Sequence, residues 1–174
     1  MLVEAGQSRT RGTTVPSGPP PHIDEILRDT QLIVRGVVGR PRSYLSPDQR
    51  YVFTDYPIER PAILYQRIID ASRHPGNVPG VTLTVLGGSV VINGLTFTEA
   101  VGALPSIEPG TDCLLLLSKK DGKLVLAGSY YGAFSVAANV LVPLTRKQGF
   151  ALEHAGADAT RAIRDLVDRL HRQR

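Results

Sequence analysis

The central part of the chain alternates short apolar runs with glycine-rich turns. Residues 81–142 hold at least six such runs, and this segment contains no histidine and no arginine. In Val81–Leu86 the apolar side chains fall on every second residue, which is typical of a strand with one buried face. Asn93-Gly94 stands between two apolar runs and favours a two-residue hairpin turn with a left-handed backbone. The segment therefore predicts a β-sheet core built from consecutive hairpins.

Further strands are expected in the first half of the chain. Leu32–Val38 is rich in β-branched residues, and Ile63–Ile69 is a second extended run. The segment between them alternates, with one face formed by Tyr51, Phe53 and Asp55 and the other by Val52, Thr54 and Tyr56. Pro57 and Pro61 lack the amide proton that a central strand donates, so we expect this strand to lie at an edge or to contain a bulge.

Turn residues separate these runs. Gly39–Gln49 is interpreted as a loop or the end of a hairpin, and Ser72–Gly80, with two Pro-Gly pairs, as the clearest loop in the chain. Asp121-Gly122 is expected to join the two strands of a hairpin. Ala133–Val142 is expected to form the last strand.

Two helices are expected, one on each side of the strand-forming region. Ile23, Ile26 and Leu27 share one helical face. Near the C-terminus, Asp158 is a suitable N-cap for an amphipathic helix, and arginines and aspartates four residues apart can pair along its polar face. Its apolar stripe consists of Ile163, Leu166, Val167 and Leu170. We expect this stripe to dock on the β domain, with a dimer contact or a partner's groove as the alternatives.

The order of these elements predicts a mainly β fold. We expect a small OB-like barrel, closed or partly open, with a short N-terminal helix and a C-terminal amphipathic helix. At 174 residues the chain has the length of one domain. We divide it into a flexible lead-in (1–21), the barrel domain (22–142), a linker (143–157) and the helix (158–174).

Basic residues are concentrated outside the core segment. The formal net charge is +4, whereas residues 81–142 hold three lysines and four acidic residues, a net of −1, so the flanks hold +5. A basic surface can contact phosphate groups or an acidic membrane. The arginines near the C-terminus also suit a solubilising helix face, so charge alone does not select nucleic acid as the partner.

The sequence shows no catalytic constellation. No histidine lies at metal-ligand spacing from another histidine, a cysteine or a carboxylate; the four are His22, His74, His154 and His171. The single Cys113 cannot form an internal disulfide, and its apolar surroundings predict a buried thiol. Phosphate-loop, dinucleotide-binding and nucleophile-elbow motifs are absent. We therefore expect no catalytic residue, no metal and no cofactor, and a protein that is not an enzyme.

Aromatic and basic residues are interleaved in the first half of the chain. On a barrel face such a mixture binds single-stranded nucleic acid or sugars, because flat rings stack on aromatic side chains and cations hold the anionic backbone. Alternation along the strands also sends many of these rings into the core. The candidate ligand-binding residues are Arg35, Arg40, Arg42, Arg50, Tyr51, Phe53, Tyr56 and Arg67.

Membrane and export signals are absent from the sequence. No apolar stretch approaches the roughly 18 residues of a membrane span. Residues 1–21 lack the basic start and the continuous apolar core of a signal peptide, so we expect no leader in this sequence.

A series of short motifs follows Gln31 and ends at Val136. It comprises Tyr51–Tyr56, Pro79-Gly80, Gly87-Gly88, Val101–Pro105, Glu108–Asp112, Leu114–Leu117, Asp121–Lys123, Ala127-Gly128 and Tyr131–Phe134. This series is similar to a group of uncharacterised bacterial domains. The resemblance implies a small barrel of the OB or netrin-like type and export from the cell, and it transfers no catalytic residue. The chain departs from the group at Thr111-Asp112, where the group has an acidic residue directly after Pro-Gly.

Together these observations favour a non-enzymatic binding or accessory domain whose ligand is a protein or a cell-envelope component. The alternative is an OB-type binder of single-stranded nucleic acid that uses the arginine and tyrosine face. An enzyme with dispersed catalytic residues is a more distant third interpretation. The helix at 158–174 is a candidate for dimerisation.

Overall fold

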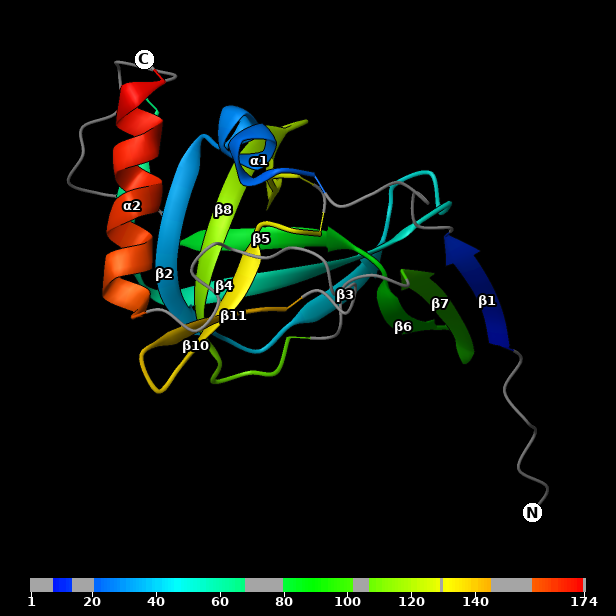
Figure 1. Ribbon diagram of the computed structural model, residues 1–174. Helices are drawn as coiled ribbons and strands as arrows, with labels where there is room; N and C mark the ends of the chain where they lie inside the picture. Colours follow the sequence, from blue (N-terminus) through cyan, green and yellow to red (C-terminus); the bar gives the residue numbers. More distant parts are fainter. Residues whose placement is uncertain are drawn as a thin grey trace.

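The computed structural model describes residues 8–13, 21–67, 80–101, 107–128, 130–144 and 158–173 (Figure 1). These residues form eleven strands and two helices. The helices are α1 (Ile23–Asp29) and α2 (Ala159–Arg172). The strands are β1 (Ser8–Thr13), β2 (Leu32–Val38), β3 (Arg42–Leu45), β4 (Val52–Gln66), β5 (Val81–Leu86), β6 (Gly88–Ile92), β7 (Leu95–Val101), β8 (Asp112–Lys120), β9 (Lys123–Leu126), β10 (Ala133–Ala137) and β11 (Val140–Pro143).

Five of the strands close into a barrel. β2 pairs antiparallel with β4 and with β8, β4 pairs with β5, and β8 pairs with β9. A parallel contact between Leu83 of β5 and Leu124 of β9 completes the ring. β3 pairs with the start of β4, and β10 and β11 extend the sheet from β8. The mainly β prediction is confirmed, with a small closed barrel and one helix toward each end of the chain.

Strand β8 is buried on both faces. Cys113, Leu115 and Leu117 point into the barrel interior, whereas Leu114 and Leu116 point to the outside, under the helices. All five side chains are fully buried. This double burial explains why the segment is a continuous apolar run in the sequence rather than an alternating one.

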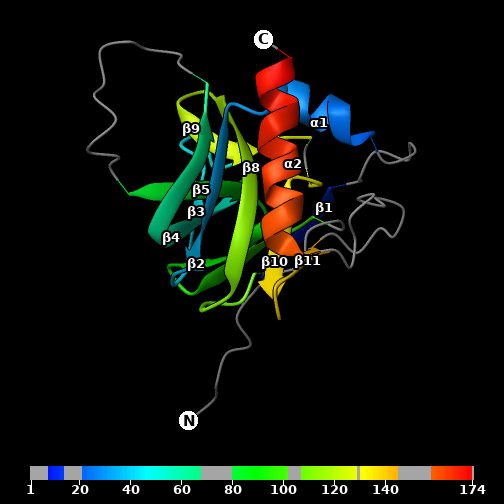
Figure 2. The ribbon, with the colours of Figure 1, turned by 60° about the vertical axis from the view of Figure 1, so that its left-hand side comes forward.

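The helices cover the outer face of this part of the sheet. Ile26 and Leu27 of α1 and Leu166 and Leu170 of α2 pack in one cluster with the outward leucines of β8. Figure 2 shows α2 running alongside β8, with α1 next to α2. Asp158 accepts a hydrogen bond from the Arg161 amide, which confirms it as the N-cap of α2. The apolar stripe of α2 is therefore buried against the β domain rather than left open for a second chain.

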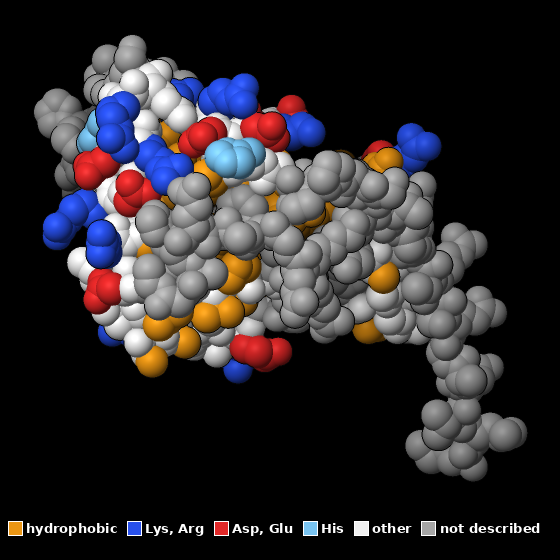
Figure 3. All heavy atoms as spheres, in the orientation of Figure 1, with side chains coloured by type: hydrophobic (Ala, Val, Ile, Leu, Met, Phe, Trp, Pro, Cys, Tyr) orange, Lys and Arg blue, Asp and Glu red, His pale blue; other side chains and the backbone are white. Residues whose placement is uncertain are grey.

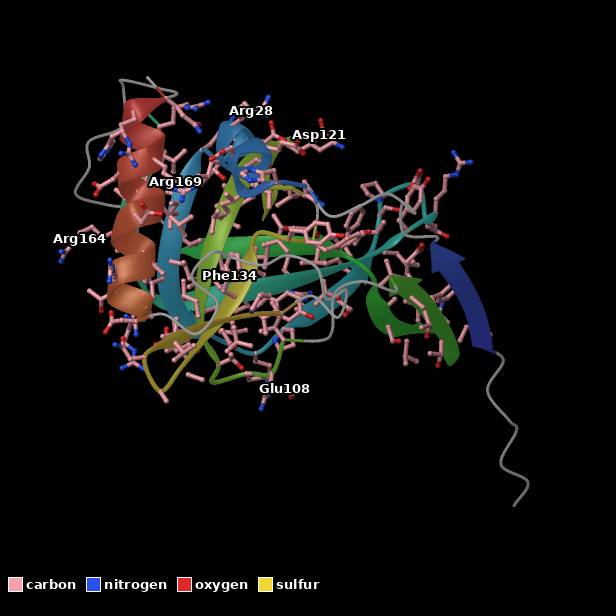
Figure 4. The ribbon with its side chains drawn as sticks, in the orientation of Figure 1. Arg28, Glu108, Asp121, Phe134, Arg164 and Arg169 are labelled. Carbon is pink, nitrogen blue, oxygen red and sulfur yellow. The ribbon has the colours of Figure 1, made fainter. Side chains whose placement is uncertain are left out.

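An ion-pair network joins the two helices. The Arg169 guanidinium donates to Asp165, one of the expected pairs along α2, at 2.9 Å. It also lies 3.7 Å from the Asp24 carboxylate of α1. Figure 4 shows Arg169 on the side of α2 that faces α1, and Arg164 on the opposite side. The network adds a polar contact between two helices that share one apolar layer.

The long strand β4 is central and contains bulges. It pairs with β2 on one edge and with β5 on the other, so the edge alternative is wrong. The bulge alternative is confirmed, because the register with β2 shifts between Arg35 and Val37, opposite the segment that includes Pro61. At this shift Arg60 has a left-handed backbone with φ of 49°. The extra residue lets a strand with two prolines remain inside the sheet.

The hairpin predictions are confirmed in two places and corrected in a third. The turn residues of β6–β7 and β8–β9 are Asn93-Gly94 and Asp121-Gly122, with φ of 51° and 78°, and 50° and 78°. The expectation of one strand over Ala133–Val142 is wrong. Ala138 and Asn139, with φ of 48° and 61°, form a turn between β10 and β11. A left-handed alanine is costly, and its apolar side chain hid the turn in the sequence.

Two loop predictions fare differently. Gly39–Gln49 contains a short strand, β3, which pairs with β4, so this segment includes the first arm of a hairpin. Ser72–Gly80 lies outside the described residues except for its last glycine.

The hairpin β6–β7 leaves the barrel and forms a second, smaller sheet. β7 pairs antiparallel with β6 and, on its other edge, in parallel with β1. β1 lies inside the predicted lead-in, at a segment with no apolar residue to indicate a strand. We call β1, β7 and β6 the projecting sheet, because it lies at the end of the molecule away from α2 (Figure 1).

A glycine pair sets the angle at which this sheet leaves the barrel. Gly87 and Gly88 have φ of 116° and 122°. A side chain at Gly88 would place its Cβ only 2.2 Å from the hydroxyl of Thr54 and 2.7 Å from that of Ser43. The Thr54 hydroxyl also donates to the Gly87 carbonyl at 2.6 Å. The corner is close-packed, so the hairpin is held firmly to the barrel wall.

Candidate functional site

Among the arginines singled out in the sequence, Arg35 is bound by a carboxylate and Arg50 and Arg67 lie at opposite ends of β4. The Arg35 guanidinium donates to both carboxylate oxygens of Asp112 (Nε to Oδ1 3.2 Å, NH2 to Oδ2 2.8 Å). These hydrogen bonds raise the pKa of Arg35 above its ordinary value and pair its charge. Arg67 follows the end of β4, whereas Arg50 precedes its start, so the 15-residue strand separates them. Arg40 and Arg42 are exposed near β3.

The aromatic candidates also divide between two environments. Tyr56 is 7% exposed and packs in the barrel interior, so it belongs to the core. Phe53 is half-buried on the outer face of β4, and Tyr51 is exposed beside it. Because Arg42 is the register partner of Asp55, and Tyr44 that of Phe53, the structure brings these residues together on the outer face of β3 and β4.

A lysine from β9, a strand distant in the sequence, completes this face. Lys123, the first residue of β9, places its ammonium 4.4 Å from the centre of the Phe53 ring and 5.1 Å from that of Tyr44. The two rings are 6.1 Å apart and tilted by 32°. We call Tyr44, Phe53, Asp55, Thr84 and Lys123 the Lys123 cluster.

Hydrogen bonds run through the cluster from the cation to the carboxylate. The Lys123 ammonium donates to the Tyr44 hydroxyl at 3.0 Å, and that hydroxyl donates to Oδ1 of Asp55 at 3.2 Å. Thr84 of β5 donates to the same oxygen at 2.7 Å. Among the described residues no carboxylate lies within ion-pair distance of Lys123. Its half-buried ammonium is therefore stabilised by the Tyr44 hydroxyl and by the faces of the Tyr44 and Phe53 rings. Such a cation can bind an anionic ligand, and the adjacent rings can bind a flat one.

Sequence reasoning found only one member of this cluster, Phe53. The other members come from four strands, β3, β4, β5 and β9, and meet because the barrel closes between β5 and β9. No periodicity links Tyr44 to Lys123 along the chain. The signal that was available is weaker: a lysine directly after an Asp-Gly turn stands at the rim of a barrel.

The hairpin of the projecting sheet presents a second surface. Val91, Ile92 and Leu95 are 66%, 38% and 40% exposed, and residues 88–98 include no charged side chain. The other large exposed apolar side chains in the described part of the chain, Tyr51 and Val142, lie elsewhere. In contrast, side chains of both charges intermingle over α1 and α2 on the face shown in Figure 3. The hairpin tip is thus the main concentration of exposed apolar residues.

The described residues include no group of three or more metal-ligating side chains placed to hold an ion. Burial, and secondarily the neighbouring Asp112, raises the pKa of the Cys113 thiol to about 12, so it stays protonated. His22 caps α1 and His171 packs against Tyr65, while His74 and His154 lie outside the described residues. No helix in the described part of the chain has the length and apolar character needed to cross a membrane.

Comparison of the chain with protein-family models, with curated proteins and with solved structures found no match in any of the three. The resemblance to an OB or netrin-like group therefore stays a prediction.

Proposed function

We propose that this protein is a non-enzymatic binding or accessory domain, and that its ligand is a protein or a cell-envelope component. One observation carries the proposal: three of the five large exposed apolar side chains in the described structure gather at the tip of the β6–β7 hairpin. Exposed apolar residues cost free energy in water, about 25 cal/mol for each Å² left uncovered. Their concentration on one projecting element is characteristic of a contact surface.

The attachment of the hairpin supports this role. The Gly87-Gly88 corner is held by the hydrogen bond from the Thr54 hydroxyl to the Gly87 carbonyl and packs closely against Thr54 and Ser43, so the tip is presented in a defined direction. A preformed surface loses less conformational entropy on binding than a mobile loop.

Site-specific photo-cross-linking tests the proposal. The photo-reactive residue p-benzoylphenylalanine replaces Val91 in the native host, and in a matched control it replaces Thr160, which is exposed on α2. We expect one discrete adduct from position 91, lost when Ile92→Ser and Leu95→Ser are introduced as well, and none from position 160. No adduct at position 91, or the same adducts at both positions, would contradict the proposal.

The second candidate function is OB-type binding of single-stranded nucleic acid. Taken in chain order, the five barrel strands are arranged first, second, third, fifth and fourth around the ring, with the third and fifth parallel, which supports an OB-type barrel. The face of the second and third strands is where OB domains bind oligonucleotides. Three members of the Lys123 cluster belong to these strands, Phe53 and Asp55 to β4 and Thr84 to β5.

Binding of a labelled single-stranded oligonucleotide at low and high salt tests this candidate. Neutralising a phosphate contact reduces both the affinity and its salt dependence. We expect Lys123→Gln to weaken binding and to lower the salt slope by about 1, whereas Arg164→Gln, with the same change in charge on α2, leaves both unchanged. Equal effects of the two substitutions would indicate non-specific attraction.

A further inference from the structure

The outer edge of β7 holds an extended segment of the chain. β1 pairs with it in parallel over six residues, from Ser8 opposite Thr96 to Thr13 opposite Val101. In the described sheets β7 is the only strand that β1 pairs with. The edge therefore accepts an added strand, the mode in which main-chain hydrogen bonds bind an extended peptide.

The segment in this site is a weak occupant by its composition. Residues 8–13 are Ser-Arg-Thr-Arg-Gly-Thr, without an aliphatic or aromatic residue. The sequence of the segment offers no apolar side chain to the sheet, and each backbone hydrogen bond adds little because water offers the same partners to the free strand. The tether to the barrel compensates by raising the local concentration of the segment.

β7 offers two chemical features to a strand on this edge. Glu99 is only 4% exposed, and its register partner in β1 is an arginine, Arg11. Four residues earlier, on the same face of β7, Leu95 is 40% exposed. The pairing with β1 ends at Thr96, so a strand that continues one residue further reaches Leu95. The chain's own residue before Ser8 is a glutamine.

We propose that the β7 edge binds an extended segment of a partner protein, in parallel, with an aliphatic residue opposite Leu95 and an arginine four residues later opposite Glu99. β1 is the resident strand that this segment displaces. The partner segment is defined by an arginine that complements the charge of Glu99 and an aliphatic side chain that covers Leu95. A segment with both features gains more binding free energy at this edge than the resident strand does. The proposal rests on the protein-binding role proposed above and deepens it.

Peptide binding to the full chain tests the motif. The probe is a dye-labelled peptide, Leu-Ser-Arg-Thr-Arg-Gly-Thr, which matches residues 7–13 with leucine in place of glutamine, and binding is followed by fluorescence anisotropy. We expect saturable binding that weakens about tenfold when the leucine becomes glutamine, and about tenfold when the second arginine becomes alanine. These changes lie in the peptide, so they leave the fold of the protein intact.

A disulfide lock tests the site. Thr10→Cys with Thr98→Cys joins β1 to β7 at a register pair, and we expect the oxidised protein to lose peptide binding and the reduced protein to regain it. The control, Ser89→Cys with Thr98→Cys, joins β6 to β7 at residues whose hydroxyls are 2.9 Å apart. This disulfide does not bind β1, so β1 can still be displaced from the edge. The buried Cys113 does not compete in either protein.

Two results would overturn the proposal: equal binding to the locked and control proteins, or no saturable binding to any of them. If the cross-link from position 91 persists in that case, only the strand site is refuted and the binding function stands. If position 91 gives no cross-link but the lock abolishes peptide binding, the strand site stands and the contact surface proposed at the hairpin tip is refuted.

Discussion

The corner between β5 and β6 gives the sharpest test of how the projecting sheet is held. Gly88→Ala adds one methyl group where Cβ would lie 2.2 Å from Thr54 Oγ1 and 2.7 Å from Ser43 Oγ. The φ of 122° is also a conformation that side chains rarely adopt, which costs about 1–3 kcal/mol. Thr54 is 5% exposed, so displacing its hydroxyl from the Gly87 carbonyl leaves buried polar groups unpaired, at about 1–3 kcal/mol.

We therefore expect Gly88→Ala to lower the free energy of unfolding by about 2–6 kcal/mol, measured by urea denaturation followed by circular dichroism. Gly94→Ala is the matched control, because Gly94 also has a positive φ, 78°, but no atom lies within 4 Å of the added methyl group. It should cost only the backbone strain, about 1–2 kcal/mol.

A double-mutant cycle identifies the cause. Thr54→Ala removes the nearest obstacle, so Gly88→Ala should be less costly in that background than in the native chain. Equal costs at positions 88 and 94, within about 0.5 kcal/mol, would refute the view that this corner is close-packed.

Three further predictions follow from other parts of the structure. Cys113 should not react with a thiol reagent at pH 8 until denaturant is added. Its folded pKa of about 12 exceeds the ordinary 9.0, so its contribution to stability should be constant below pH 9 and decline as the pH rises from there toward 12. Urea titrations at several pH values would show this decline. Leu166→Ala, at a side chain 2% exposed under α2, should cost about 2–5 kcal/mol in urea unfolding, whereas Val142→Ala, at 45% exposure, should cost less than about 0.5 kcal/mol. Lys123→Met should lower the free energy of unfolding by about 1 kcal/mol, because the contact of the ammonium with Tyr44 and Phe53 is lost. Lys120→Met, at the exposed end of the same hairpin, should change it by nothing measurable. Equal effects would mean that the ring contacts do not stabilise the barrel.

The local patterns in the sequence predicted most of the barrel. Val81, Leu83 and Val85 alternate because one face of β5 lines the interior, and the Asn-Gly and Asp-Gly turns mark their hairpins because both residues accept a left-handed backbone. The turn at Ala138-Asn139 was missed because alanine is not a typical turn residue. The pairing of the flanking strands β10 and β11 holds Ala138 in its left-handed conformation.

The candidate site was less predictable, for a physical reason. Tyr44 and Lys123 are 79 residues apart in the sequence and meet only when β9 closes the ring against β5. Arg35, a candidate from the sequence, is instead bound by Asp112, a partner 77 residues away. β1 was missed because residues 8–13 include no aliphatic or aromatic residue, so the sequence shows no alternating apolar pattern there.

Strand β8, buried on both faces, makes the barrel and the helical layer one cooperative unit. Loss of α2 would expose Leu114 and Leu116, and loss of the barrel wall would expose Cys113, Leu115 and Leu117, so neither layer can open alone at small cost. Amide protons of β8 should therefore exchange only through global unfolding. Neither core includes a residue of β6 or of Leu95–Ala100 in β7, the part of the projecting sheet whose burial is described, so amides there can exchange through local opening. The molecule thus combines a scaffold that unfolds as a whole with a smaller sheet whose strands can open locally beyond the fixed Gly87-Gly88 corner.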